Sequence, residues 1–391
     1  MKFRITPVNG GVCVVDGIFA SGVKAGFKKD DFDVGFIRSE KEMDIVYLFT
    51  TNRFQAAPIK YVKRKNIKKT NFILANSKNA NALTGEEGIK DIEELMEYLK
   101  EKVEVKNPLM SSTGVIGVRL DKEKIKKAID KFNFSEKNSY AFSRAIMTTD
   151  SFPKEVAFEV EGEFGKFKIG GVAKGAGMIN PAMATMLCFI TTDADIKDDM
   201  REILKEINEI TFNAISVDGD TSTNDSVFLM TTREGDYDKE AFREALYQVM
   251  LKLALDIVRD GEGATKSVAF VVSGAKNKEE AKKAAKALTN SLLVKTALFG
   301  EDPNWGRFAS TVGASGVECY EDKLKIAIEN VVLYDRGKIL MTKEVEKKAH
   351  EIMKRDSFKI YIDLGVGEGN FTAYGCDLSY EYVKINAEYR T

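Results

Sequence analysis

The sequence predicts an α+β protein in which sheets pack in layers with helices outside them. Strand-like apolar runs and helix-like periodic segments are interleaved along the chain, but without the regular rhythm of a parallel βαβ fold. The chain has 391 residues, of which 44% are hydrophobic and 30% are charged. A globular chain of this length suits two domains or subdomains, each with a core of its own.

Short apolar runs between Gly-, Asn- and Asp-rich turns predict the strands. The expected strands cover 12–15, 45–49, 72–74, 115–118, 155–170, 325–333, 357–363, 370–376 and 380–386. Apolar residues at helical spacing predict the helices. The expected helices cover 89–103, 121–132, 136–147, 197–215, 238–260 and 278–290.

The charge balance argues against nucleic acid as a partner. The chain has 59 basic and 60 acidic residues, and its basic residues are not interleaved with stacking aromatics. The longest apolar runs, such as 186–190 and 268–272, are too short to cross a bilayer. The first residues lack an apolar run of signal-peptide length. We therefore expect a cytoplasmic protein that binds neither nucleic acid nor membrane.

The cysteines and the single histidine limit which catalytic mechanisms and metal sites the chain can have. The four cysteines lie far apart and lack CxxC spacing, so we expect buried reduced thiols and no metal site. The single histidine, His350, sits in a charged helical segment, where we expect it on a solvated face. A Ser-His-Asp or Cys-His mechanism needs a histidine base, so acid–base chemistry falls to carboxylates, lysines or a terminal amine.

The segment 169–192, IGGVAKGAGMINPAMATMLCFITT, contains several glycines followed by Pro181 and then an apolar run. Glycines permit backbone angles that other residues avoid, and proline restricts one turn. This pattern predicts a tightly turned loop that delivers the hydroxyl of Thr185 to the start of a buried strand. Taken alone, the segment is explained more simply as a Gly-rich loop entering a core strand, because short motifs are weak signals.

The same arrangement suits self-cleavage between Ala184 and Thr185. A threonine hydroxyl held against the preceding carbonyl can attack it, and hydrolysis of the resulting ester completes the cut. The new terminal α-amine titrates near ~8, so it can act as a base beside the hydroxyl at neutral pH. A threonine activated by its own amine is a known kind of nucleophile, and it needs no histidine.

Beyond single residues, long blocks of the chain resemble one enzyme family. The segment KGAGMINPAMATML (174–187) resembles the ornithine acetyltransferases, also called glutamate N-acetyltransferases, of the cyclic arginine pathway. Further blocks match in family order over nearly the whole chain: FTTNRFQAAP (49–58), ANSKNANALTG (75–85), SSTGVIG (111–117), IMTTDSFPK (146–154), SVDGDTSTND (216–225), DGEGATK (260–266), KTALFGEDPNWGR (295–307) and VKINAEYRT (383–391).

The resemblance implies a layered αββα sandwich of the self-processing N-terminal-nucleophile type. It implies an alpha chain of residues 1–184 and a beta chain of residues 185–391, assembled as a heterotetramer of two of each. The implied reaction moves acetyl from N-acetylornithine to glutamate and releases ornithine and N-acetylglutamate. No cofactor or metal is implied. Some members of the family also accept acetyl-CoA as donor and others do not, so both donors stay open.

The resemblance also assigns catalytic roles. Thr185 would carry the acetyl group as an ester, and Thr113 and Gly114 would form an oxyanion hole from a hydroxyl and a backbone N–H. Donors aimed at the developing negative oxygen are worth ~3 kcal/mol each. Without the resemblance, Thr113 and Gly114 read as an ordinary turn.

The remaining roles concern substrate binding. Lys174 would pair with an amino-acid carboxylate or keep the new terminal amine neutral, and Glu262 would bind the side-chain amine of ornithine. The C-terminal tail would fold back into the site. The implied substrate-binding residues are Thr148 (Thr149 if the register shifts by one), Lys174, Thr185, Glu262, Asn386 and Thr391. The blocks 75–85, 216–225 and 295–307 are expected to form structure or active-site walls.

Two other readings use the same residues. A self-processing amidohydrolase or aminopeptidase would share the nucleophile but use water as acceptor. A scaffold with an uncut Gly-rich loop would have no such chemistry.

Overall fold

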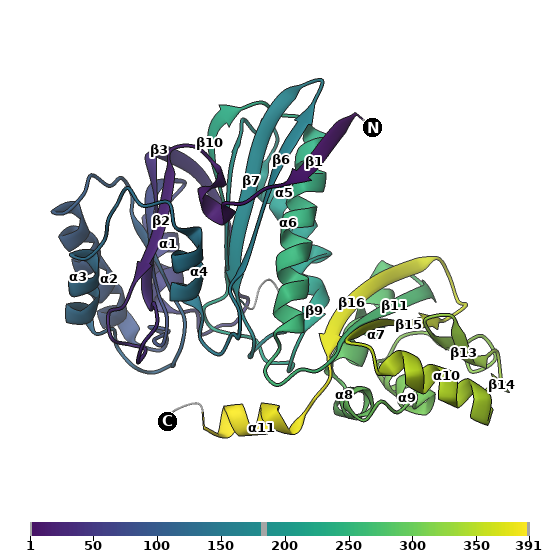
Figure 1. Cartoon of the computed structure of the whole chain (residues 1–391). Coiled ribbons are helices and arrows are strands. Elements are labelled where there is room, and N and C mark those ends of the chain that lie inside the picture. Colours follow the sequence, from purple (N-terminus) through teal and green to yellow (C-terminus); the bar gives the residue numbers. More distant parts are fainter. Residues whose placement is uncertain (1, 181–185, 389–391) are drawn as a thin grey trace. The chain divides into compact units, whose positions relative to one another are not determined.

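The computed structural model describes residues 2–180 and 186–388, which form two compact units (Figure 1). The first unit comprises Met1–Gly175, Pro181–Asn213 and Thr221–Ile257, and the second comprises Ala176–Asn180, Ala214–Asp220 and Val258–Thr391. These units differ from the alpha and beta chains expected from cleavage after Ala184. A cleavage point is a chemical boundary and need not coincide with a folding boundary.

The first unit is built around a nine-stranded mixed sheet in the order β1-β6-β7-β8-β10-β3-β4-β5, with β2 paired to β3. Only β8–β10 and β4–β5 are parallel pairs among these neighbours. The strands are β1 (Phe3–Pro7), β2 (Ile18–Val23), β3 (Val34–Phe49), β4 (Lys69–Asn76), β5 (Leu109–Ser112), β6 (Lys154–Gly162), β7 (Gly165–Lys174), β8 (Leu187–Ala194) and β10 (Ser226–Gly235). The helices are η1 (Gly11–Val14), α1 (Ala57–Lys65), α2 (Gly85–Lys100), α3 (Lys122–Ile129), α4 (Ser139–Ile146), α5 (Met200–Glu209) and α6 (Lys239–Arg259).

Helices cover both faces of this sheet at β7. On one face Phe167 of β7 packs against Phe242 of α6, with ring centroids 6.0 Å apart. On the other face η1 approaches so closely that a Cβ on Gly170 would lie 2.1 Å from the Gly11 carbonyl oxygen. The glycines of segment 169–192 were expected in a tightly turned loop, and for Gly170 and Gly171 that expectation is wrong. Both lie inside β7, where small residues let the layers come together.

The second unit contains a seven-stranded mixed sheet in the order β14-β13-β12-β15-β11-β16-β9. Its strands are β9 (Ile215–Ser216), β11 (Ser267–Ala275), β12 (Lys325–Ile328), β13 (Val331–Asp335), β14 (Lys338–Ile339), β15 (Ser357–Asp363) and β16 (Gly369–Cys376). Its helices are α7 (Lys278–Asn290), α8 (Leu292–Phe299), α9 (Trp305–Ala314), α10 (Lys343–Met353) and α11 (Tyr380–Ala387), and the short turn η2 (Phe212–Ala214) leads into β9. A core of buried apolar side chains from the sheet, α7, α8, α9 and α10 holds this unit together.

The expected α+β class is confirmed, and the long periodic helices occur where expected. Three expected strands are wrong. Residues 12–15 begin in η1, where Gly10 and Gly11 have positive φ. Within residues 115–118 only Val115 forms an isolated bridge, and residues 380–386 lie in α11. Each is a short apolar run, and periodicity cannot separate helix, strand and loop over so few residues.

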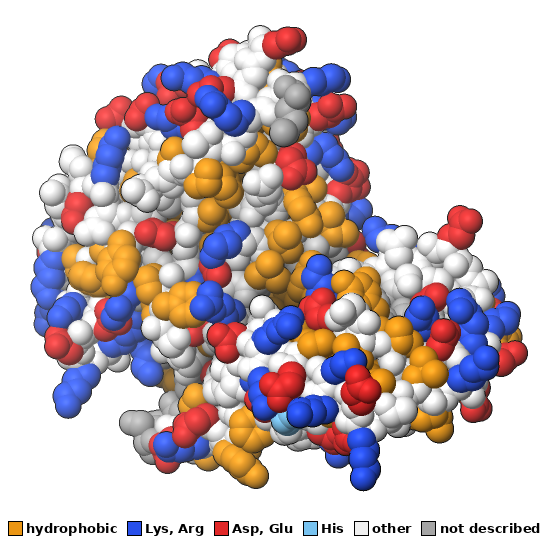
Figure 2. Space-filling view, turned by 45° about the vertical axis from the view of Figure 1, so that its right-hand side comes forward, with side chains coloured by type: hydrophobic (Ala, Val, Ile, Leu, Met, Phe, Trp, Pro, Cys, Tyr) orange, Lys and Arg blue, Asp and Glu red, His pale blue; other side chains and the backbone are white. Residues whose placement is uncertain are grey.

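The surface mixes acidic and basic side chains over the visible face (Figure 2). Among the described residues, no helix has both the length and the apolar character that a membrane span requires. Cys188 and Cys376 are buried as expected, whereas Cys13 and Cys319 are only half-buried. His350 is half-buried and not fully solvated, because its Nδ1 lies 2.8 Å from the carbonyl oxygen of Glu301.

Candidate active site

The turn that carries Thr113 and Gly114 begins directly after β5. Gly114 has φ +131°, and a Cβ there would lie 2.2 Å from the backbone carbonyl carbon of Lys78, so only glycine fits. On either side of it, the Thr113 N–H donates to the Asn76 carbonyl (3.1 Å) and the Val115 N–H to the Lys78 carbonyl (3.2 Å). The chain is therefore held against the end of β4 at this point.

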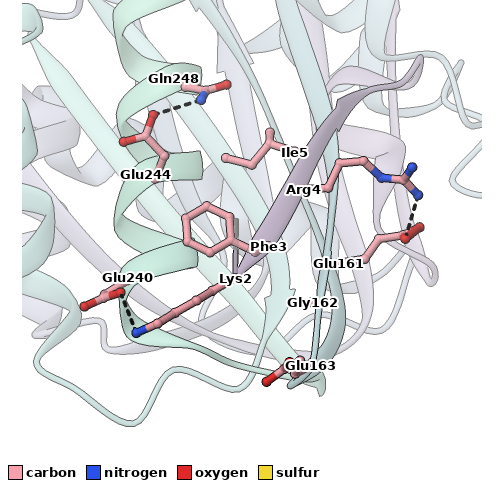
Figure 3. Close-up of a pocket in the computed structure, with 10 residues that line it drawn as sticks. All are labelled: Lys2, Phe3, Arg4, Ile5, Glu161, Gly162, Glu163, Glu240, Glu244 and Gln248. Atoms are coloured by element: carbon pink, nitrogen blue, oxygen red, sulfur yellow. Dashed lines mark hydrogen bonds and ion pairs between the residues drawn. The ribbon is translucent and has the colours of Figure 1, made fainter.

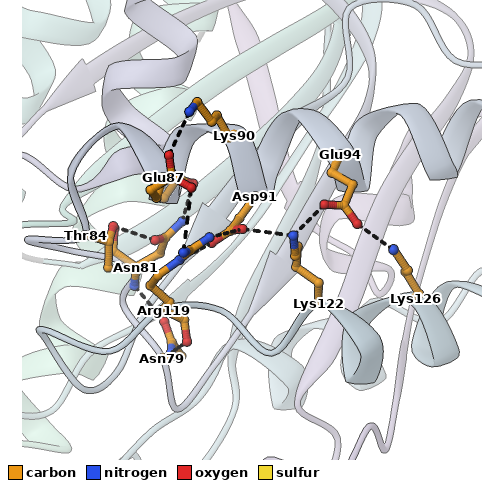
Figure 4. Close-up of polar contacts among 11 residues, drawn as sticks. Asn79, Asn81, Thr84, Glu87, Lys90, Asp91, Glu94, Arg119, Lys122 and Lys126 are labelled. Carbon is orange, nitrogen blue, oxygen red and sulfur yellow. Dashed lines mark hydrogen bonds and ion pairs between the residues drawn. The ribbon is translucent and has the colours of Figure 1, made fainter.

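The far end of the same turn is anchored to helix α2 (Figure 4). The Asn79 amide donates to the carbonyls of Val118 (3.1 Å) and Arg119 (3.0 Å). The Arg119 guanidinium makes two hydrogen bonds to Asp91, at 2.9 and 2.6 Å, and Lys122 lies 3.2 Å from the same carboxylate. The side chain of Asp91 is only 1% exposed, so this pairing ties the turn to a rigid element.

Lys174 is the last residue of β7 and lies beside this turn. It pairs with Leu187 of β8, and it is only 7% exposed. Its Nζ donates to Thr113 Oγ1 at 3.3 Å. A hydroxyl that accepts from an ammonium group still has its own hydrogen to donate to a developing anion. The structure thus brings Lys174 and the Thr113–Gly114 pair together.

A buried carboxylate, Asp150, links the predicted substrate-binding residue Thr148 to Gly175, which directly follows Lys174. It accepts the N–H of Thr148 (3.0 Å) and the N–H of Gly175 (2.7 Å), and it pairs with Lys154 at 2.8 Å. The side chains of Asp150 and Lys154 are fully buried. Burial alone would raise the pKa of the Asp150 carboxyl, but the charges of Lys154 and Lys174 lower that pKa below its usual range.

In the second unit the structure brings Glu262 and Asn386 together. The Asn386 amide Nδ2 donates to Glu262 Oε2 at 2.7 Å, and the carboxylate is largely buried. Gly177 lies against this carboxylate, because a Cβ there would sit 2.4 Å from the Glu262 carboxyl carbon. The Glu262 N–H donates to the Ala176 carbonyl at 2.9 Å, which holds the Gly-rich segment beside it.

Asp218 holds the next residues of the Gly-rich segment in the same unit. Its two carboxylate oxygens accept the N–H groups of Met178 (2.6 Å) and Ile179 (2.8 Å), and the Tyr382 hydroxyl donates to it at 3.3 Å. Burial, followed by the nearby Asp218 charge, raises the pKa of Tyr382 above its usual value. Helix α11 and the segment after Lys174 are therefore linked through one carboxylate.

Three predicted site residues lie outside the described residues: Ala184, Thr185 and Thr391. β8 begins at Leu187, two residues after Thr185. The chain therefore leaves β7 at Lys174 and enters the paired strand β8 shortly after the predicted nucleophile.

Asp150, Asp218 and Asn224 carry no sequence signal of their own that predicts a role in the site. Asp150 lies in block 146–154, and Asp218 and Asn224 lie in block 216–225. The block 216–225 was expected to form structure or walls, and the hydrogen bonds of Asp218 and Asn224 agree with that expectation. Family matches of this length were the only signal that could have found these residues.

A separate surface hollow of about 1050 Å³ lies at the edge of the first sheet (Figure 3). Phe3 and Ile5 of β1 point toward α6 there, and Glu240 and Glu244 of α6 line its other side. None of the predicted site residues lines it. Within the part of the chain that the structure describes, no group of three His, Cys, Asp or Glu side chains could hold a metal ion.

Comparison with known proteins shows the family to which this chain belongs. Residues 19–391 match the model of the ArgJ family, and the chain belongs to that family. It is 59% identical to a bifunctional arginine-biosynthesis protein ArgJ from Wolinella succinogenes, over the whole of both chains. It is 46% identical to a glutamate N-acetyltransferase from Methanocaldococcus jannaschii, over 98% of this chain and 99% of that one.

A solved structure of an arginine-biosynthesis bifunctional protein ArgJ from Bacillus halodurans is 40% identical to this chain. It aligns with a TM-score of 0.48 over 51% of this chain and 97% of that one. The sequence matches at full length make this chain an enzyme of the acyltransferase class.

Proposed function

We propose that this enzyme cuts itself between Ala184 and Thr185 and then moves acetyl groups from N-acetylornithine to glutamate in arginine biosynthesis. The observation that carries the proposal is the match at 46% identity, over nearly the full length of both chains, to a glutamate N-acetyltransferase. The contact between Lys174 and Thr113 supports it, because it puts a cation and a hydroxyl beside the strand pair that flanks Thr185.

Self-cleavage comes first in the proposed sequence. The Thr185 hydroxyl attacks the Ala184 carbonyl carbon, the C–N bond breaks, and the nitrogen of Thr185 takes up a proton to become a free amine. Water then hydrolyses the Ala184–Thr185 ester, which leaves an alpha chain of 1–184 and a beta chain of 185–391. The freed amine lies one carbon from the hydroxyl carbon and serves as the general base.

Transfer follows in two half-reactions. Thr185 Oγ attacks the acetyl carbonyl of N-acetylornithine, its proton passes through the α-amine to the leaving nitrogen, and ornithine departs. The neutral glutamate amine then attacks the acetyl ester, the C–O bond to Thr185 breaks, one amine proton passes through the α-amine to Thr185 Oγ, and N-acetylglutamate leaves. Thr113 and Gly114 stabilise the oxyanion in both half-reactions. Water has to be excluded while the ester persists, or the acetyl group is lost.

Substrate binding is proposed to involve the residues that the family resemblance names. Lys174 and Thr148 are proposed to hold the α-carboxylate end of the amino acid, and Glu262 is proposed to bind the side-chain ammonium of ornithine. The contact from Asn386 to Glu262 supports a role for α11 in orienting that carboxylate. Thr391, in the C-terminal tail, is proposed to contact the substrate. The assembly is proposed to be a heterotetramer, the location cytoplasmic, and acetyl-CoA an alternative donor.

The experiment that tests this function measures ornithine release from N-acetylornithine with and without glutamate. Transfer predicts release at a steady rate only when glutamate is present, together with an equal amount of N-acetylglutamate. Equal release in its absence would make the protein an amidohydrolase with water as acceptor. The Thr185→Ala variant should be inactive in both conditions. Acetyl-CoA with glutamate, in the absence of N-acetylornithine, tests the second donor.

A further inference from the structure

Asn224 lies in the short loop before β10 and is 6% exposed. Its two amide hydrogens go to two carbonyls, those of Ala80 (2.6 Å) and Ser112 (2.8 Å). Its side-chain oxygen accepts the Thr223 hydroxyl at 2.6 Å. The amide therefore has one orientation in which each of these groups is satisfied, and a buried amide held this way is rigid.

The two carbonyls that Asn224 holds belong to the base of the Thr113–Gly114 turn. Ser112 is the last residue of β5 and directly precedes Thr113. Ala80 contacts the other side of the turn, because its N–H donates to the Val115 carbonyl at 3.0 Å. The Asn224 side chain thus hydrogen-bonds the backbone on both sides of the proposed oxyanion hole, at Ala80 and at Ser112.

The loop that carries Asn224 also hydrogen-bonds the chain at the start of β8, directly after the proposed nucleophile. Two residues after Asn224, the Ser226 N–H donates to the Met186 carbonyl at 2.8 Å, and Met186 directly follows Thr185. Ser226 also pairs with Leu187 in the β10–β8 ladder. Its hydroxyl donates back to the Asn224 carbonyl at 2.8 Å, which closes the loop on itself.

We infer that Asn224 is a positioning residue that holds the Thr113–Gly114 turn in a fixed place relative to the start of β8. The inference rests on the proposed function, because it takes Thr113, Gly114 and Thr185 in their proposed roles. Asn224 does not touch substrate; it acts through the backbone of Ser112 and Ala80. A shift of about 1 Å in a catalytic group can lower a rate about 100-fold, whereas substrate binding by other residues is untouched. Loss of Asn224 should therefore appear in kcat and not in KM.

The test is Asn224→Asp, which keeps the size of the side chain and replaces both donors with an anionic oxygen that repels the two carbonyls. We expect kcat per cleaved chain to fall about 10- to 100-fold. We expect KM for N-acetylornithine and for glutamate to stay within about twofold. The matched control is Asn71→Asp. Asn71 is a buried asparagine at the other end of β4, and its amide also bonds backbone, at Glu104 and Lys106. The kcat of the Asn71→Asp variant should match that of the wild type even if the melting temperature of the variant falls.

A second variant covers the case in which Asn224→Asp does not fold. Thr223→Val removes the hydrogen bond that orients the amide but leaves both donors in place, so kcat should fall several-fold with KM unchanged. A folded variant with wild-type kcat, in either position, would overturn the inference. Transfer is first measured on the wild type. If the wild type does not transfer acetyl to glutamate, the proposed function itself fails; if it does and the variants match it, only the role of Asn224 fails.

Discussion

Lys174 Nζ lies 3.3 Å from Thr113 Oγ1, which joins the last residue of one sheet strand to the turn that follows another. The contact brings a buried cation to the hydroxyl proposed to stabilise the reaction's oxyanion. Two residues far apart in the sequence thus form one electrostatic unit at the ends of β5 and β7.

The first prediction concerns that hydroxyl. Thr113→Val keeps the shape of the side chain and removes its hydrogen-bond donor. We expect kcat to fall about 100-fold, with KM nearly unchanged, because the donor acts on charge that develops after binding. Steady-state kinetics measure this. Thr231→Val, which removes a buried hydroxyl in β10, is the control and should keep the wild-type kcat. Equal losses in both variants would contradict the role of Thr113.

The second prediction concerns the buried pair of Asp150 and Lys154. Asp150→Asn removes a buried carboxylate that is ion-paired with the buried Lys154, so we expect the free energy of unfolding to fall by about 3 kcal/mol at neutral pH. Chemical denaturation measures it. Asp16→Asn, which breaks an exposed pair with Lys168, is the control and should change that free energy by less than about 1 kcal/mol.

The pH dependence of the same pair has a defined sign. The native pKa of Asp150 lies below its usual value, so the unfolded state takes up the proton first as pH falls. The stabilisation from Asp150 is therefore fully present above about pH 4 and lost progressively below it. The stability difference between wild type and Asp150→Asn should shrink as pH is lowered from about 5 to about 3. A difference that grows over this range would show that the carboxyl is not charged in the native state.

Much of the fold could be predicted from sequence, and the reason is periodicity. Helix α7 has the bounds that its spacing predicts, and α6 differs by one residue at each end. Residues 380–386 were wrongly predicted as a strand. They lie in the eight-residue helix α11, whose Tyr380 and Val383 are exposed, so it has no buried apolar face that periodicity could detect.

The site could be predicted only in part. The resemblance named Lys174, Thr113 and Glu262, but the polar residues that hold them carry no pattern of their own. Asp150 and Asn224 are single polar residues in loops, where sequence alone suggests a turn. Their importance comes from burial and from the backbone groups that they bond, and only the fold supplies both.

The third prediction concerns the Gly-rich segment. Gly177→Ala would put a Cβ within 2.4 Å of the Glu262 carboxylate, which has to move away. Since the end of a flexible side chain can shift at small cost, we expect little change in melting temperature but an increased KM for N-acetylornithine. Kinetics and thermal melting check this together. Gly313→Ala, in helix α9 with nothing within 4 Å of the added Cβ, should leave the KM unchanged and raise the melting temperature slightly, because alanine favours a helix more than glycine does. An unchanged KM in Gly177→Ala would show that the Glu262 position does not matter.

The fourth prediction concerns the charge of Glu262. Glu262→Gln keeps the contact geometry but removes the charge that would pair with an ammonium group. We expect KM for N-acetylornithine to rise about 10- to 100-fold, because hydrogen bonds to charged groups contribute about 1.5–3 kcal/mol. The KM for glutamate, which has no side-chain amine, should rise much less. Glu368→Gln on the exposed surface of the same unit is the control. Equal effects on both substrates would place the ornithine amine elsewhere.

The proposed chain break before Thr185 is the event on which the whole mechanism depends. Intact mass spectrometry of freshly purified active protein, combined with N-terminal sequencing, tests it most directly. We predict two chains, residues 1–184 and 185–391, with the second beginning TMLCFITT, and a single uncut chain for Thr185→Ala. Full acetyl transfer by a protein that remains one chain of 391 residues would contradict the account.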